Sequence, residues 1–233
     1  MPGFLDLPFE IRRMVYSFLI PQKRLIRGST FNFPLDYDDY DFFNPHRSRF
    51  NVLRLSRQIS EEALDILYGE NLFEASLNGD GENVLERRFT ERNRRRIRRV
   101  RVSMLGFSGS GSPNVPLWAS LLPNLEMLQI IAEQPVEERP YWKPPTLEKQ
   151  LNDWVKWARA YFDCFGRYLN VATRVGLDDD GRNEARSLAD RYLPLAYQSV
   201  RYGYGDLIFR RGRYSLESGY WHEDDVGMSS HDA

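Results

Sequence analysis

Apolar residues recur at steps of three and four in three long segments of the chain, which is the spacing of one face of an α-helix. The first predicted helix begins near Leu7 and ends before Pro21, because proline cannot continue a helix. Two further predicted helices cover residues 51–68 and 146–169. One face of the first helix carries five apolar side chains: Leu7, Ile11, Met14, Val15 and Phe18.

The predicted helix at 51–68 has two unlike faces, as expected of a helix with one side buried and the other in water. The apolar face consists of Val52, Leu55, Ile59, Ala63, Ile66 and Leu67. The charged face carries Arg54, Arg57, Glu61 and Asp65. The residues that follow predict a strand at 71–77 and a helix at 84–93.

From about residue 99 the pattern alternates between strands and helices, which favours βα units and a largely parallel sheet. The predicted strands cover 99–104, 125–131, 171–177 and 199–210, and the helices cover 115–122, 146–169 and 182–193. Two strand segments, starting at Ile97 and Leu125, lie 28 residues apart, a spacing typical of leucine-rich repeats. We therefore predict an α/β fold with either a short, irregular leucine-rich-repeat-like sheet or a compact one, an α+β arrangement being the other alternative.

The domain organisation follows from changes in this pattern. Residues 1–70 form a helical segment, interrupted at 22–50 by an irregular insertion that mixes aromatic with acidic residues. Residues 71–216 form the α/β body, packed as one unit with the first segment. The acidic and polar residues 217–233 predict a flexible tail.

Charge is strongly segregated along a chain whose net charge is only -1. Nine arginines and one acidic residue, Glu91, lie between Arg87 and Arg101. Such a run is typical of nucleic-acid binding, of a nuclear import sequence, or of a solvated or internally paired surface. A pI near 6.3 makes nucleic acid the less favoured partner. The candidate residues are Arg94, Arg95, Arg96, Arg98, Arg99 and Arg101, and alternation with Val100 and Val102 predicts one solvated strand face.

Other candidate chemistry in the sequence is incomplete. The Gly-rich stretch 106–112 lacks the lysine of a phosphate-binding loop, and Cys164 falls near the apolar stripe of the third helix with no histidine close in sequence. Asp178 to Asp180 and His222 to Asp225 are typical of a turn and of a solvated tail. We therefore predict no enzyme activity, no metal and no cofactor.

No segment has the roughly 20 apolar residues of a membrane span, and the first residues do not have the pattern of a secretory signal. The single Cys164 rules out an internal disulfide. The sequence therefore predicts an intracellular protein, cytoplasmic or nuclear, that does not bind membranes.

Two motifs carry a resemblance to a known family. Leu7-Pro8-Phe9-Glu10-Ile11 resembles the opening of the F-box, and Leu55-Ser56-Arg57 resembles the Ser-Arg pair of its second half. Taken together, residues 4–77 look like a fungal F-box-like family of mostly uncharacterised proteins. About 30 residues separate the two halves, and the tryptophan usual after the Ser-Arg pair is absent, with Ile59 in that region.

The resemblance implies a protein-interaction function. F-box proteins dock on a Skp-family adaptor and recruit a protein substrate to a cullin-based ubiquitin ligase. The positions that match the docking motif are Leu7, Pro8, Ile11, Val15, Leu19, Leu55 and Arg57. The alternatives are a structural or interaction protein whose F-box-like helices are only core, and a nucleic-acid-associated protein that uses the arginine segment.

Overall fold

The computed structural model describes eleven stretches of the chain. They are residues 3–20, 22–23, 25–27, 49–77, 81–104, 111–135, 146–179, 181–193, 196–200, 212–214 and 221–223.

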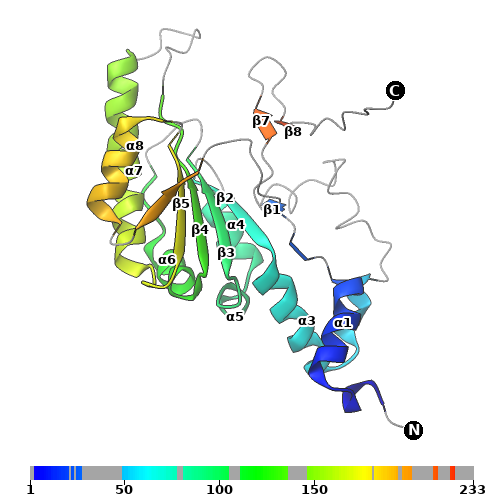
Figure 1. Cartoon of the computed structure of the whole chain (residues 1–233). Coiled ribbons are helices and arrows are strands. Elements are labelled where there is room, and N and C mark those ends of the chain that lie inside the picture. The colour runs from blue at the N-terminus through cyan, green and yellow to red at the C-terminus, as the bar shows by residue number, and fades with distance from the viewer. Residues whose placement is uncertain are drawn as a thin grey trace, which may run out of the picture.

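A six-stranded parallel sheet forms the centre of the described structure, which confirms the predicted α/β class (Figure 1). Its strands are adjacent in chain order: β1 (Leu25–Arg27), β2 (Leu72–Ser76), β3 (Arg99–Ser103), β4 (Met127–Ile131), β5 (Arg174–Asp178) and β6 (Tyr197–Ser199). Each pair is parallel, so every connection crosses back over the sheet. The order never reverses, so the described sheet has no switch point of the kind at which doubly wound folds bind ligands.

The helices that connect β2 to β6 cover one face of the sheet. They are α4 (Gly81–Arg88), α5 (Glu91–Arg94), α6 (Val115–Leu121), α7 (Leu147–Tyr168) and α8 (Asn183–Tyr192). The main core contains Val100, Leu128 and Leu177 from the sheet together with Trp118 and Trp154 from the helices. Leu72 and Met127, on the opposite face, are outside this cluster. The described helices between β2 and β6 therefore lie on one face of the sheet, although residues of the other face, such as Leu72 and Gln129, are buried as well.

The spacing of the strands is uneven. Leu72 pairs with Arg99 and Arg99 with Met127, crossings of 27 and 28 residues, whereas Met127 pairs with Arg174, 47 residues further on. The long helix α7 fills this last crossing. Only the crossings from β2 to β3 and from β3 to β4 stay within one residue of the predicted spacing of 28 residues, so the repeat is irregular.

A second, smaller core lies in the N-terminal part of the chain. It is built by α1 (Phe9–Leu19), a short 3-10 helix η3 (Arg49–Arg54) and α3 (Arg57–Glu70), and we call these elements the N-terminal module. Its buried residues are Tyr16, Ile20, Val52, Ile59, Ala63 and Ile66. Figure 1 places α1 at the end of the molecule opposite α7 and α8, with α3 running from beside α1 to the sheet.

Several predicted boundaries shift for local reasons. The first helix starts at Phe9, because Pro8 is still extended and residues 4–6 form a separate 3-10 turn. The predicted helix at 51–68 begins as η3, and its regular part starts where the Ser56 hydroxyl accepts a hydrogen bond from the Ile59 amide at 3.2 Å. The predicted helix at 84–93 is two helices, because Thr90 caps α5.

Other predictions about strands and faces are wrong. Arg101 belongs to the strand face that the alternation predicts to be solvated, yet its side chain is buried. Arg101 shares a register row with Glu74 and Gln129 on the neighbouring strands, donates to the Gln129 side chain at 2.7 Å and lies 3.7 Å from the Glu74 carboxylate. A polar row across adjacent strands thus allows a buried guanidinium.

Three short strands lie where none was predicted. The insertion at 22–50, expected to be irregular, contributes β1 at Leu25–Arg27. The tail expected to be flexible from residue 217 contributes β8 (Trp221–Glu223), which pairs with β7 (Gly212–Tyr214). The remainder of the insertion from 28 to 48, the Gly-rich stretch 106–110 and the chain from 201 to 211 lie outside the described residues.

Candidate docking surface

Helix α1 is attached to its neighbours by its polar residues. Arg12 and Tyr16, one turn apart, are the buried residues of this helix, and Ile20 follows directly after it. Tyr16 lies edge-on to the ring of Phe4, 5.8 Å between centroids. The helix therefore packs on α3 with a face that its apolar pattern does not mark.

Glu62 of α3 holds this face. Its carboxylate accepts hydrogen bonds from Arg12 Nε at 2.9 Å and Nη2 at 2.6 Å, and from the Tyr16 hydroxyl at 2.8 Å. The guanidinium is thus bound as a fork, and it also donates to the backbone oxygen of Leu7 at 2.5 Å. Near one end of α3, Arg13 adds an ion pair to Glu70 at 2.5 Å.

The same contacts shift the pKa values of Glu62 and Tyr16. Hydrogen bonds from Arg12 lower the pKa of Glu62 to about 2, and Gln58 and Tyr16 donate further hydrogen bonds to it. Burial raises the pKa of Tyr16 to about 12, and its hydrogen bond to Glu62 acts in the same direction. Glu62 is therefore a carboxylate, and Tyr16 a neutral phenol, across the physiological range.

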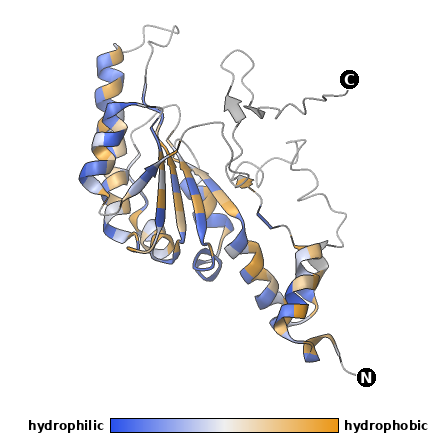
Figure 2. Ribbon diagram, viewed as in Figure 1, coloured by the Kyte–Doolittle hydropathy of each residue, from blue (hydrophilic) through white to orange (hydrophobic). Residues whose placement is uncertain are grey.

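The apolar face of α1 is exposed. Ile11, Met14, Val15 and Phe18 keep between 39 and 84% of their surface in solvent. Leu5, Leu7 and Phe9, at the start of the module, are exposed as well. Of the ten large apolar residues exposed in the described part of the chain, eight belong to residues 5–18 or are Leu55, and the others are Val115 and Val171. In Figure 2 the hydrophobic positions of α1 lie at the far end of the molecule from the sheet.

The predicted docking residues mostly lie on the surface. Leu7, Pro8, Ile11, Val15 and Arg57 are exposed, and Leu19 is half-buried because it packs against the small core. Leu55, which the pattern placed on the buried face of its helix, is 69% exposed. It lies in the turn before α3, outside the helical repeat, and η3 packs against α1.

The residues that position α1 are not visible in the apolar pattern. Arg12, Tyr16 and Glu62 look like ordinary surface positions of two amphipathic helices. A signal was present, because Arg12 and Tyr16 are four residues apart and occupy one side of the helix opposite the apolar stripe. The sequence alone does not identify Glu62, 50 residues after Arg12, as their partner.

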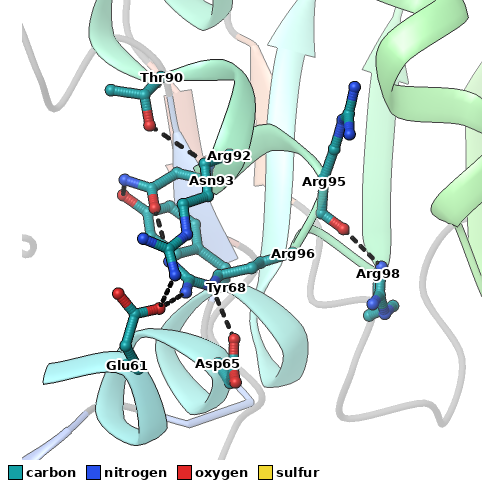
Figure 3. Close-up of polar contacts among 9 residues, drawn as sticks. All are labelled: Glu61, Asp65, Tyr68, Thr90, Arg92, Asn93, Arg95, Arg96 and Arg98. Atoms are coloured by element: carbon teal, nitrogen blue, oxygen red, sulfur yellow. Dashed lines mark hydrogen bonds and ion pairs between the residues drawn. The ribbon is translucent and has the colours of Figure 1, made fainter. Parts of the chain in front are cut away.

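The arginine segment is mostly bonded within the molecule (Figure 3). Arg92 and Arg96 both contact the carboxylate of Glu61 on α3, and Arg96 Nε donates to Asp65 at 2.6 Å. Asn93, between them, donates to the Tyr68 hydroxyl at 3.3 Å. The partners Glu61, Asp65 and Tyr68 all lie on α3.

The other candidate arginines have partners too. Arg94 donates to the carbonyl oxygens of Glu86 and Phe89, Arg95 pairs with Glu91 at 2.5 Å, and Arg98 donates to the carbonyls of Arg95 and Asn124. Arg99 donates to the Glu70 carbonyl at 3.2 Å. Together with the buried Arg101, these contacts favour an internally paired segment among the three interpretations of the run.

The described residues hold a second polar cluster, inside the body. Glu82 accepts hydrogen bonds from the Trp118 indole, from the backbone N–H of Asn114 at 3.1 Å and from the Tyr161 hydroxyl at 3.2 Å. Cys164 is buried, as predicted, and burial raises the pKa of its thiol to about 11. Such a thiol is protonated and unreactive near neutral pH.

The described residues do not form a metal-binding site. Within the stretches the structure describes, no group of three His, Cys, Asp or Glu residues is arranged to hold a metal ion. Asp179 instead accepts from the Gly181 amide at 2.8 Å and pairs with Arg186 at 3.0 Å. The positive φ of Gly181 completes this turn.

None of the helices among the described residues is long and apolar enough to cross a membrane. Comparisons with protein-family models, with curated proteins and with solved structures found no match.

Proposed function

We propose that this chain is a non-enzymatic protein-interaction module, and specifically a substrate-recruiting F-box-type subunit of a cullin-based ubiquitin ligase. The observation that carries the proposal is the exposed apolar face of α1, at the positions where the sequence resembles the F-box docking motif. In this function the N-terminal module binds a Skp-family adaptor and the α/β body holds a protein substrate.

The energetics of α1 support a docking role. Full burial of one Val, Ile, Met or Phe side chain contributes about 1.5 to 3 kcal/mol before the cost of association, so the four side chains on this helix face can anchor a partner. The helix keeps its place without burying them, because Arg12, Tyr16 and Arg13 bind carboxylates of α3. A partner can therefore cover the face without unfolding the module.

The alternative in which both helices are only core has less support. For α3 it describes the structure well, since Ile59, Ala63 and Ile66 are buried. For α1 it would require the stripe to be buried against the body, whereas Phe18 is 84% exposed. A nucleic-acid function for the arginine segment is weakened by its internal partners.

The test is a binding titration between the purified chain and a purified Skp-family adaptor. The variant Leu7→Ala with Ile11→Ala removes two exposed residues of the docking face, and we expect its Kd to rise by about tenfold or more. The matched control is Val115→Ala with Val171→Ala, which removes two exposed residues elsewhere and leaves Kd unchanged. Both variants keep the unfolding temperature of the parent protein.

Three outcomes contradict the proposal. One is no detectable complex at tens of micromolar. Another is equal weakening by the two double variants. The third is unfolding of the Leu7 and Ile11 variant, which would support the core interpretation instead. Retention on DNA or RNA that falls steeply between low and physiological salt would favour the nucleic-acid alternative.

A further inference from the structure

Helix α3 connects the two cores of the molecule. Its residues Ile59, Ala63 and Ile66 belong to the small core, while Tyr68, near its end, packs against the main one. Tyr68 stacks on Phe73 and meets Phe89 edge-on, each 5.7 Å between centroids. The orientation of the N-terminal module relative to the sheet is therefore set by the direction in which α3 leaves the sheet.

The covalent connections to the sheet are short. One residue, Asn71, separates α3 from β2, and its buried side chain donates to the Leu67 carbonyl at 2.7 Å. On the other side, α1 leads to the edge strand β1 within a few residues. Both connections join the sheet at β1 and β2, so they restrain the near end of α3 more than the end that carries Glu61.

Arg96 reaches α3 from the body at that farther point. It contacts Glu61 and Asp65, one turn apart on the helix, and its side chain is only 13% exposed. Its Nη1 also donates to Asn93 at 2.9 Å, which in turn donates to Tyr68. Arg92 adds a second cation on Glu61 at 2.7 Å, but its side chain is largely exposed.

We propose that Arg96 is a positioning residue that braces α3 against α5 and so fixes the orientation of the N-terminal module relative to the sheet. A planar guanidinium suits this task, because it binds two carboxylates at a fixed geometry that a lysine cannot reproduce. The arginine segment then serves as an internal brace. The inference goes beyond the proposed function and holds whether or not an adaptor binds α1.

The experiment measures the distance between the module and the body. Ser17 on α1 and Ser187 on α8 are exposed positions. Spin labels are attached to cysteines introduced by Ser17→Cys and Ser187→Cys in a protein that also carries Cys164→Ala. Pulsed electron resonance then records the distribution of distances between the two labels. We expect one narrow distribution for the parent and a distribution at least twice as broad, or shifted, for Arg96→Gln. Arg96→Lys keeps the charge without the fork and gives an intermediate width.

Arg95→Gln is the matched control. It removes the same charge from the same segment, but Arg95 pairs with Glu91 of its own helix only four residues away. Its distribution should equal that of the parent. Equal widths for Arg96→Gln and Arg95→Gln would overturn the inference, as would a full effect of Arg95→Gln.

Arg96→Gln must also fold for the comparison to hold, which circular dichroism and thermal unfolding check. If it does not fold, Asp65→Asn replaces it, because this carboxylate is largely exposed and is one of the two carboxylates that Arg96 binds. We expect a smaller broadening from Asp65→Asn than Arg96→Gln would give. An unchanged distribution in that variant overturns the brace. Adaptor binding enters none of these measurements, so this inference and the proposed function fail separately.

Discussion

Helices α1 and α7 have the same kind of apolar stripe and opposite surroundings. In α7, Trp154, Ala158, Phe162 and Phe165 are buried on the sheet. In α1 the corresponding stripe faces solvent, and the contact with the rest of the protein is made by Arg12 and Tyr16. Periodicity thus locates an apolar face, but it does not say whether that face is covered by the same chain.

The difference lies in how each helix is held. Helix α7 is held on the sheet by the burial of apolar surface, which is favourable because it removes that surface from water. Helix α1 is held by a charged hydrogen-bond network around Glu62, which is directional and requires each partner. Substitutions in α1, α3 and α7 can therefore separate these two modes of attachment.

The largest effect is expected in the core contact of α7. Phe165 is fully buried and lies edge-on to Trp118, 5.1 Å between ring centroids. Phe165→Ala leaves a cavity and should cost about 3 to 5 kcal/mol of unfolding free energy. Denaturant unfolding measures it. A cost below about 1 kcal/mol would mean that α7 is not part of the main core.

Removal of the Glu62 charge should have the next largest effect. Glu62→Gln keeps the shape of the side chain but leaves the Arg12 guanidinium, largely buried, without its carboxylate, at a cost of about 1 to 3 kcal/mol. Glu10→Gln is the matched control, since Glu10 is an exposed carboxylate of α1. Unfolding in urea compares the two. Equal stability of both variants would show that the network does not hold α1.

Acid should weaken the same network in the unchanged protein. The pKa of Glu62 falls to about 2 on folding, so its contribution is fully present above the ordinary carboxyl pKa of 4.5 and is lost as the pH falls from 4.5 through 2. Unfolding free energies of the parent and Glu62→Gln, measured from pH 6 to pH 2, should converge in that window. A constant difference contradicts this assignment.

The sequence predicts the body better than the N-terminal module. The strands at 72–76, 99–103 and 127–131 and the capped helix α7 follow from period and turn residues, and each lies where the pattern places it. Arg101 departs because its burial depends on Glu74 and Gln129, which register alone brings beside it. The periodicity of apolar residues and the local strand propensity do not show which residues of neighbouring strands will lie side by side.

At the candidate docking surface the sequence identifies the face but not its support. Ile11 and Val15 follow from the helical repeat and from the F-box resemblance, and both are exposed. The role of Glu62 depends on the approach of two helices whose sequence positions are 50 residues apart. The brace at Arg96 is similar, because Glu61 is 35 residues away and lies on another helix.

The smallest effect on stability is expected on the exposed face of α1. Phe18 is 84% exposed, so Phe18→Ala removes no packed contact and should change the unfolding free energy by less than about 0.5 kcal/mol. The matched comparison is Phe165→Ala, the same change in the buried stripe of α7. If Phe18→Ala and Phe165→Ala lowered the unfolding free energy by similar amounts, the two helices would not differ in this way, because the face of α1 would then be packed in the free protein. A cost near zero at Phe18, together with a clear loss of adaptor binding, would instead assign this face to a partner.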